Sequence, residues 1–450
     1  QMKLKNLACV LLGAGFLAPT LASATNGYFQ HGYGVKNSGR AGVAAAFTDD
    51  TFGGANNPAQ MVWVGQRLDV GLNWFRPTRE ASRIGTPGGA FDFSEQSDND
   101  DFFIPEFGYN YVINPNMSFG ITVYGNGGMN TTYESGASLA GGQAACTRGA
   151  STGPANPLCG VGALGVNLSQ LIIAPTLAYK LNEQNSIGIA PLIGYQRFKS
   201  YGLQAFGQIS SFPPSVLGNP GSDSAWGLGV RVGWLGKFDR LSVGAAYATK
   251  IYMSEFDRYK GLFAGQGDFD IPANLNVGVK FNATPALALG LDYQYIWYSD
   301  VNAVGNSSRV PGCIPRPPFG PGVGAACLGA SDSSIGFGWD NVGVIKFGVE
   351  YKPTEQWTLR AGYSWGDQPI DSADVTFNIL APGVIEQHFT LGFTYEINKH
   401  SEVSMSYMHA FENEVTGPFS NPYFPGPGVP GTETIQMHQD AVGIAYSMKW

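Results

Sequence analysis

The 450-residue chain has only 13% charged residues, where a soluble domain has about 25%, and its 62 glycines are about twice the average usage. This composition argues against a cytosolic enzyme. The formal net charge of -8 argues against a nucleic-acid partner.

The first 24 residues have the pattern of a secretory signal peptide. Lys3 and Lys5 form a basic region, residues 7–17 form an apolar core, and Ala22-Ser23-Ala24 is an A-x-A cleavage signal. We therefore expect residues 1–24 to be removed and the chain to be exported.

Residues 25–66 are rich in glycine and alanine, and no strand pattern runs through them. They precede a long series of expected strands. A barrel of about fourteen strands encloses a lumen too wide for its own side chains to fill. We interpret residues 25–66 as an N-terminal plug that fills this lumen.

Residues 67–450 alternate with period two between apolar and small or polar side chains, as half-buried strands do. Between Leu287 and Tyr298, one face is entirely leucine, tyrosine and tryptophan, and the other is mostly small or polar. An even number of strands is typical of bacterial barrels. The expected strands are about fourteen, at 67–77, 101–113, 117–129, 168–181, 186–200, 224–238, 241–255, 271–282, 286–299, 339–352, 356–366, 385–397, 402–412 and 437–450.

The connections alternate between short turns and long segments rich in Gly, Pro and Ser, which is the pattern of a membrane barrel with short periplasmic turns and long external loops. After residue 25, apolar runs are far shorter than the roughly 18 to 20 residues of a membrane helix. The chain ends on Trp450, as barrels of this kind commonly end on an aromatic residue. The sequence predicts an all-β, fourteen-stranded antiparallel transmembrane β-barrel in the outer membrane of a Gram-negative cell.

Four cysteines remain after the signal peptide, and they form two close pairs in Gly/Pro-rich stretches. We expect Cys146 to pair with Cys159 and Cys313 with Cys327, as disulfides that staple external loops. A zinc site is the alternative, but neither pair has C-x-x-C spacing or a nearby histidine. The five histidines show no metal spacing and no catalytic motif is present, so we expect no metal, no cofactor and no enzymatic activity.

The third expected strand contains a cluster of glycines, Gly125, Gly127 and Gly128. Such a cluster weakens a strand ladder and marks a bulge or bend. One interpretation is that the strand ends early into its external loop. The other is an inward kink that opens the barrel wall sideways, through which an apolar solute could enter the bilayer.

The chain resembles the FadL family of outer-membrane long-chain fatty acid transporters. The resemblance rests on Gly39-Arg40-Ala41, Asp49-Asp50 and Asn57-Pro58-Ala59 in the plug, and on Ile121-Thr122-Val123 and residues 269–279 in the barrel. It covers essentially the whole mature chain, with the loops least alike.

The resemblance implies a monomeric barrel, surrounded by outer-membrane lipid and lipopolysaccharide and closed by a hatch. Ligands would be caught in an apolar groove of the external loops, pass to a pocket beside the start of the hatch, and leave through the kink in the third strand. Transferred by position, Asn57, Pro58 and Ala59 end the hatch, Gly127 and Gly128 lie at the kink, and Tyr28 and Phe29 lie near the pocket. Pro58 can equally be a plain turn proline.

Family members that hold a carboxylate use basic residues, but the corresponding positions here are Gly202 and Asp340. Arg197, Lys199 and Lys346 are nearby substitutes. We expect passive uptake of long-chain fatty acids, with neutral aromatic or aliphatic hydrocarbons as the alternative ligands. From other functional classes, a water-filled porin and an outer-membrane lipid hydrolase stay open.

Overall fold

The computed structural model describes residues 26–134, 139–146, 153–213, 217–309, 312–316, 320–419 and 430–450. The expected signal peptide, residues 1–24, lies outside these ranges. No helix in them is long and apolar enough to cross a membrane.

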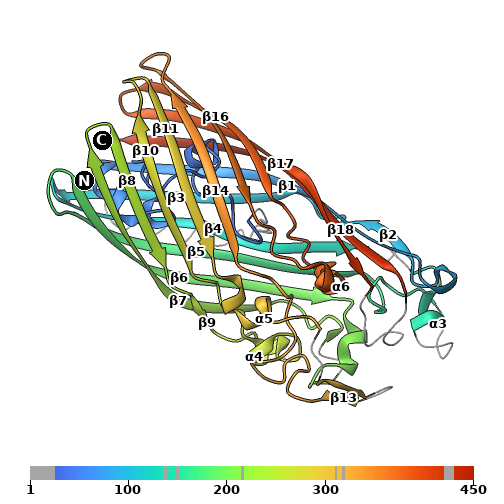
Figure 1. Cartoon of the computed structure of the whole chain (residues 1–450). Coiled ribbons are helices and arrows are strands. Elements are labelled where there is room, and N and C mark those ends of the chain that lie inside the picture. The colour runs from blue at the N-terminus through green and yellow to red at the C-terminus, as the bar shows by residue number, and fades with distance from the viewer. Residues whose placement is uncertain are drawn as a thin grey trace.

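One antiparallel sheet of sixteen strands dominates the chain and closes on itself because its first strand pairs with its last (Figure 1). Two short strands, β2 (Phe93–Gln96) and β9 (Tyr252–Met253), pair only with β1 and β7, which leaves fourteen strands in the closed barrel. The predicted fold class is confirmed. The barrel strands are β1 (Arg67–Ile84), β3 (Phe102–Asn114), β4 (Met117–Tyr133), β5 (Leu164–Lys180), β6 (Asn185–Tyr201), β7 (Asp223–Phe238), β8 (Leu241–Ala248), β10 (Asn274–Asn282), β11 (Leu287–Ile296), β14 (Val342–Tyr351), β15 (Trp357–Gly366), β16 (Gln387–Asn398), β17 (Ser401–Pro418) and β18 (Thr432–Lys449).

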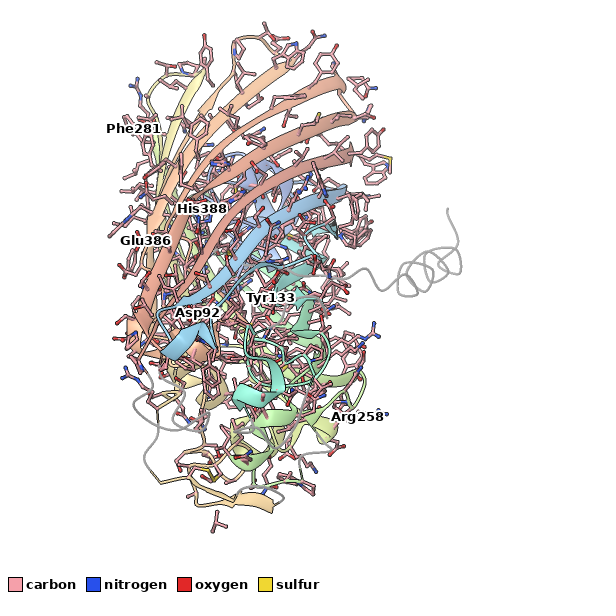
Figure 2. All side chains as sticks on the ribbon, turned by 90° about the vertical axis from the view of Figure 1, so that its right-hand side faces the viewer. Asp92, Tyr133, Arg258, Phe281, Glu386 and His388 are labelled. Atoms are coloured by element: carbon pink, nitrogen blue, oxygen red, sulfur yellow. A yellow bond between two sulfur atoms is a disulfide. The ribbon has the colours of Figure 1, made fainter. Side chains whose placement is uncertain are left out.

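The two faces of the wall separate apolar from polar side chains as the sequence alternation predicts. On β11, Leu291 and Tyr293 are exposed on the outside, whereas Asp292 and Gln294, which alternate with them, are buried inside. Figure 2 shows Phe281 projecting outward near the end with short turns, and Arg258 among the loops at the other end. The outer surface is therefore suited to lipid and the inner one to polar contacts.

Several strands are longer than the sequence predicts. β1 extends to Ile84 instead of residue 77, and β17 and β18 continue together beyond residue 412. These extensions are polar because they project past the membrane, where the outward face meets water. Other strands are shorter than predicted, most of all β8, which ends at Ala248 instead of residue 255.

The segments between the long strands form a cap at the external end (Figure 1). Disulfides join Cys146 to Cys159 and Cys313 to Cys327 in this cap. The cap also holds the hairpin of β12 (Ile314–Arg316) with β13 (Gly320–Val323). Its short helices and 3-10 turns are η3 (Pro87–Gly89), α3 (Gly142–Cys146), η4 (Gln204–Gln208), η6 (Asp257–Tyr259), α4 (Ala264–Gly267), η7 (Tyr298–Asp300), α5 (Asn302–Gly305), η8 (Ser372–Asp374) and α6 (Val375–Asn378).

Residues 26–65, called here the N-terminal segment, lie inside the barrel and are almost entirely buried. The segment contains α2 (Val35–Ser38), η1 (Phe52–Gly54) and η2 (Pro58–Trp63). Inward-facing carboxylates hold its backbone: Glu106 accepts from the Val35 N–H at 3.0 Å, and Asp292 accepts from the Ala44 N–H at 2.7 Å.

Buried ion pairs also fix the same segment to β14 and β17. Arg40 lies 2.7 Å from Glu350 of β14 and also binds Asp49. Lys36 pairs with Glu402 of β17, which in turn binds Arg67. Removing one member of such a pair leaves a buried charge uncompensated, which is strongly destabilising. The segment is therefore held on several sides.

Asn57, Pro58 and Ala59 anchor the end of the N-terminal segment to β6 and β7. The Asn57 side chain caps η2 by accepting from the Ala59 N–H, and it donates to the Trp234 carbonyl of β7 at 2.9 Å. Pro58 occupies the first position of η2, where a missing N–H costs nothing. A glycine on each strand, Gly188 and Gly233, provides the space these residues need.

Candidate functional site

The glycine cluster bends β4 out of the regular wall. The register against β5 shifts between Gly125 and Gly127, so Asn126 is an extra, bulged residue. From Tyr124 to Thr131 every residue is buried, whereas a straight barrel strand would expose alternate residues. The strand does not end early, since it continues to Tyr133. The bulge instead carries this part of β4 inward.

The bend interrupts the ladder between β3 and β4. Within the described residues, the last pair of the two strands on the periplasmic side is Phe107 with Val123. Contact resumes at the external end, where the Asp98 N–H donates to the Thr132 carbonyl at 2.8 Å. Between these two points lies a stretch we call the β3–β4 interruption.

The start of the N-terminal segment bonds to β4 inside this interruption. The Gln30 N–H donates to the Asn126 carbonyl at 3.2 Å, and the Gly128 N–H donates to the Tyr28 carbonyl at 3.1 Å. Gly127 lies between these bonds, and a Cβ there would overlap the Tyr28 carbonyl. Only glycine allows the two backbones to approach so closely.

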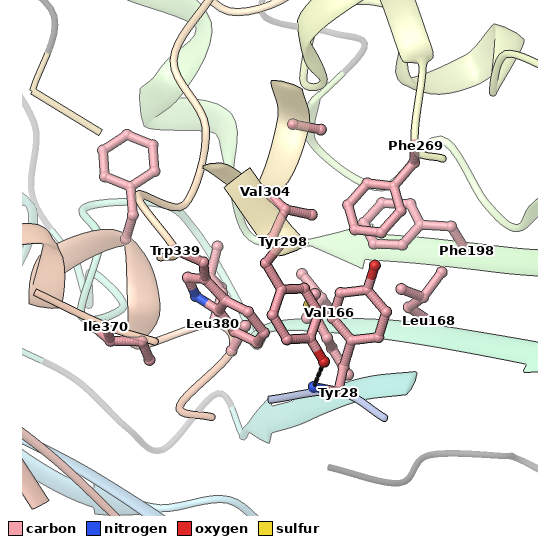
Figure 3. Close-up of a cluster of buried hydrophobic side chains, with 14 of the residues drawn as sticks. Tyr28, Val166, Leu168, Phe198, Phe269, Tyr298, Val304, Trp339, Ile370 and Leu380 are labelled. Atoms are coloured by element: carbon pink, nitrogen blue, oxygen red, sulfur yellow. Dashed lines mark hydrogen bonds between the residues drawn. The ribbon is translucent and has the colours of Figure 1, made fainter. Parts of the chain in front are cut away.

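Tyr28 lies in a buried cluster of rings (Figure 3). Phe29 belongs to the same cluster. The Tyr28 ring centroid is 5.0 Å from that of Tyr298 and 5.8 Å from that of Trp339. The Tyr28 N–H also donates to the Tyr298 hydroxyl at 3.1 Å. The start of the N-terminal segment therefore packs in the cluster of rings and is also hydrogen-bonded to the backbone of β4.

The cluster continues toward the external loops as a row of rings. The Phe269 centroid is 6.2 Å from that of Tyr28 and 4.9 Å from that of Phe263, and Phe263 is 4.8 Å from Phe198. We call the rings from Phe263 through Phe269, Tyr28 and Phe29 to Trp339 the aromatic row. It connects the loops to the β3–β4 interruption.

A cavity lies at each end of the aromatic row. The external cavity is lined by apolar side chains of the loops and strand ends. The inner cavity lies beside Gly128 and Trp339. Residues lining the external cavity include Val166, Phe198, Leu262, Phe263, Phe337 and Leu380.

Acidic groups border the middle of the aromatic row. Asp268 and Asp270 flank Phe269 in sequence, and Lys250 lies 3.7 Å from the Asp270 carboxylate. Burial, followed by the negative charge of Asp270, raises the pKa of Asp268 to about 7. These acids themselves offer no positive charge to which a carboxylate could bind.

The structure does not bring Arg197 and Lys199 into the interior, so their expected place beside the internal pocket is wrong. Arg197 is exposed on the outward face of β6 and donates to the Ser222 hydroxyl at 3.1 Å. Lys199 has the same parity, and the inward positions belong to Gln196 and Phe198. Near the end of the strand the outward face is exposed to water, so a charged side chain can be hydrated there and needs no ion-pair partner in the barrel interior.

Lys346 does lie inside, but it serves the N-terminal segment. Its Nζ donates to the His31 carbonyl at 2.8 Å, and it lines a polar cavity with Asp292. Gly202 lies after the end of β6, and Asp340 is exposed.

Sequence reasoning missed Tyr298, Trp339, Arg79 and Asn130, which line the aromatic row or the inner cavity. Period-two parity provides a signal for Arg79 because it has the same parity as the inward residue Phe75. Tyr298 likewise has the parity of the inward residues Asp292 and Gln294 of the expected strand 286–299. Trp339 gave no such signal, since it comes from a loop.

The comparisons with known proteins agree with this architecture. Residues 16–448 match the family model described as outer membrane protein transport protein (OMPP1/FadL/TodX). A curated protein of Neisseria meningitidis serogroup B, named for an outer membrane location, is 29% identical over 126 residues. That match covers only 27% of each chain, so the chain spans about a quarter of this relative's length.

Solved structures resemble the chain over nearly its full length. The toluene transporter TodX of Pseudomonas putida has a TM-score of 0.66 at 17% identity and covers 95% of this chain and 100% of its own. A FadL homologue of Pseudomonas aeruginosa has a TM-score of 0.65 at 17% identity, with 94% and 99% covered. The toluene transporter TbuX of Ralstonia pickettii has a TM-score of 0.61 at 17% identity, with 93% and 99% covered. At these identities the likeness shows the fold.

The family match covers most of the chain, and its description is that of a transport protein and not of an enzyme. The chain belongs to the OMPP1/FadL/TodX family of outer membrane transport proteins for hydrophobic compounds, and it crosses that membrane as a fourteen-stranded barrel.

Proposed function

We propose that the protein carries long-chain fatty acids passively across the outer membrane and releases them sideways into the bilayer through the β3–β4 interruption. The external cavity captures the ligand, the aromatic row conducts it past Tyr28 and Phe29, and residues 25–66 act as a hatch that excludes water. The protein works as a monomer among outer-membrane lipid and lipopolysaccharide.

The observation that carries this proposal is that the aromatic row ends where the wall ladder is interrupted. An apolar solute gains roughly 0.8 kcal/mol for each CH2 group kept from water. A route that leaves through the wall avoids an aqueous lumen. A water-filled porin is disfavoured because the N-terminal segment occupies the barrel interior.

Neutral aromatic hydrocarbons are a second candidate ligand class. The apolar lining of the external cavity favours them. The solved structures that resemble this chain include two proteins, TodX and TbuX, that are named as toluene transporters.

Uptake by cells that lack their own transporter tests the proposal. Radiolabelled oleate and toluene are supplied to cells with and without this protein. We expect faster oleate uptake in cells that contain it. Uptake of toluene alone would favour the second class, and no increase with either compound would contradict a role in hydrophobic transport.

Replacing Phe337 with Asn tests the external cavity. Phe337 is half-buried in the lining, and its backbone bonds do not depend on its ring. Full burial of an apolar side chain contributes about 1.5–3 kcal/mol, and Phe337 is only half-buried, so we expect the oleate concentration for half-maximal uptake to rise roughly fivefold with an unchanged maximal rate. Phe337→Leu is the matched control and should stay near wild type. An equal effect of both variants would contradict capture by apolar contact.

A further inference from the structure

The outward face of β6 changes from apolar to basic toward its external end. The outward positions from Ile187 to Ile193 are apolar, Tyr195 follows them, and Arg197 and Lys199 come next on the same face. At about 3.3 Å per residue and a tilt of about 40°, the stretch from Ile187 to Tyr195 covers roughly 20 Å of height, close to the ~25 Å apolar band of a barrel. Arg197 and Lys199 therefore lie where the lipid headgroups of the external leaflet begin.

A pair of rings on neighbouring strands marks the same boundary. The ring centroids of Tyr195 and of Trp226 on β7 are 4.8 Å apart, and Trp226 is exposed on the outward face. Tyrosine and tryptophan are enriched at membrane–water interfaces. The strand register places Arg197, two residues beyond Tyr195, between Ser169 of β5 and Ser224 of β7. The first basic side chain thus lies on the water side of an aromatic girdle and is flanked by hydroxyl groups.

A third cation, Arg258 of η6, lies beside Arg197. The Arg197 Nη2 donates to the Ser222 hydroxyl at 3.1 Å, and the Arg258 Nη1 donates to the Pro220 carbonyl at 2.8 Å. Residues 220–222 therefore hold both guanidinium groups. Figure 2 shows Arg258 at the edge of the molecule, among the external loops. We call Arg197, Lys199 and Arg258 the basic patch.

In the part of the chain that the structure describes, no carboxylate forms an ion pair with the basic patch. The neighbouring Lys260, in contrast, pairs with Asp257 at 2.9 Å. The Asp223 carboxylate lies close to the patch, but it accepts from the backbone N–H of Arg258 at 2.9 Å. An arginine side chain has five N–H donors, and the bonds to residues 220–222 use one from each arginine. The patch therefore keeps positive charge and donors for an anion from outside the chain.

The external rim has the opposite charge on other strands. Glu80 on the extension of β1 and Glu412 and Glu414 on that of β17 are exposed. Arg76, which is exposed on β1, is paired with Asp100 at 3.4 Å. An anionic headgroup is repelled by exposed carboxylates and attracted by unpaired cations near the membrane surface. The charge distribution therefore favours the β6 side of the wall for an anionic lipid.

We propose that the outward face of β6 binds a phosphorylated lipid of the external leaflet, with its phosphates on the basic patch and its acyl chains against the apolar wall beside Tyr195 and Trp226. Guanidinium groups match phosphate oxygens with paired, charge-assisted hydrogen bonds. A phosphate monoester has a charge of about −1.5 to −2 at pH 7, so three cations match a headgroup with two phosphates. Lipid A, the diphosphorylated lipid part of lipopolysaccharide, has this chemistry. The inference does not depend on which compound the protein transports.

Binding of lipids that share acyl chains but differ in phosphate tests the proposal. Purified protein in detergent is titrated with diphosphoryl lipid A, with the same lipid after removal of both phosphates, and with inorganic phosphate, and bound molecules are counted by native mass spectrometry. For the triple variant Arg197→Gln, Lys199→Gln and Arg258→Gln we expect at least about tenfold weaker binding of lipid A and unchanged binding of the dephosphorylated lipid. Arg76→Gln, which removes an exposed arginine outside the basic patch, is the matched control and should bind lipid A within about twofold of wild type.

Four results would overturn the proposal. They are undiminished lipid A binding by the triple variant, an equal loss in Arg76→Gln, equal affinity of the wild type for the two lipids, and displacement of lipid A by an equimolar amount of inorganic phosphate. The second would assign the effect to net charge, and the last would identify a site for a free anion. If the triple variant does not fold, judged by heat-modifiable migration on gels, Arg197→Gln alone replaces it, and a roughly threefold loss of lipid A binding is expected.

Discussion

Deleting Asn126 is expected to reduce oleate uptake to the level of cells without the protein while the barrel stays folded. Asn126 is the single residue that interrupts the register of β4 against β5, where Gly125 pairs with Leu171 and Gly127 with Gln170. Its removal makes this ladder regular. A regular β4 can continue its pairing with β3 beyond Val123 and close the wall. We expect at least a roughly tenfold drop in initial rate, because a continuous ladder in lipid leaves no unpaired backbone to open.

Asn126→Ala is the matched control for the deletion. It keeps the length of the bulge and the backbone carbonyl that accepts from Gln30, but it removes the side-chain bonds to Gln170 and Tyr33. Uptake should stay within about twofold of wild type, since the net contribution of each such bond is about 1 kcal/mol. Normal uptake by a folded deletion variant would refute the sideways route. An equal loss in both variants would assign the effect to the side chain and not to the bulge.

The fold could be predicted from the sequence because lipid imposes a simple rule on every strand. Outward residues such as Leu291 must be apolar, while inward ones such as Asp292 are free to be polar, and the alternation reveals each strand. The rule fails where a strand leaves the membrane. The polar extension of β1 to Ile84 lies beyond that limit, and the alternation by which strands are recognised ends before it.

Only the part of the site that depends on local backbone conformation could be predicted from the sequence. The glycines at 125, 127 and 128 indicated a bend because a run of glycines is unusual inside a strand. The rings of the aromatic row come from segments that are far apart in the sequence. The residue spacing within one segment does not predict contacts between such rings. The wrong expectation for Arg197 shows a second limit, since a charged side chain near a strand end is stable on either face of the wall and only parity distinguishes the two faces.

Gly188→Ala in β6 is expected to make cells permeable to hydrophilic antibiotics by displacing the N-terminal segment. A Cβ at this position would overlap the backbone of Pro58, which cannot move without the rest of η2. Such overpacking costs about 1–3 kcal/mol, comparable with what the bonds of Asn57 contribute to this anchor.

The barrel itself should still assemble, because the new methyl group faces the lumen and leaves the strand ladders intact. A barrel of this size without its filling would contain a channel of water. We expect roughly fourfold lower inhibitory concentrations of vancomycin and faster proteolysis of residues 26–65, in proportion to the population of the displaced state. Gly194→Ala on the same strand is the matched control, because its Cβ would meet only the side chains of Met253 and Ile251, at 3.1 and 3.2 Å. If both variants were as impermeable as wild type, the contact of Gly188 with Pro58 would not be what holds the segment in the lumen.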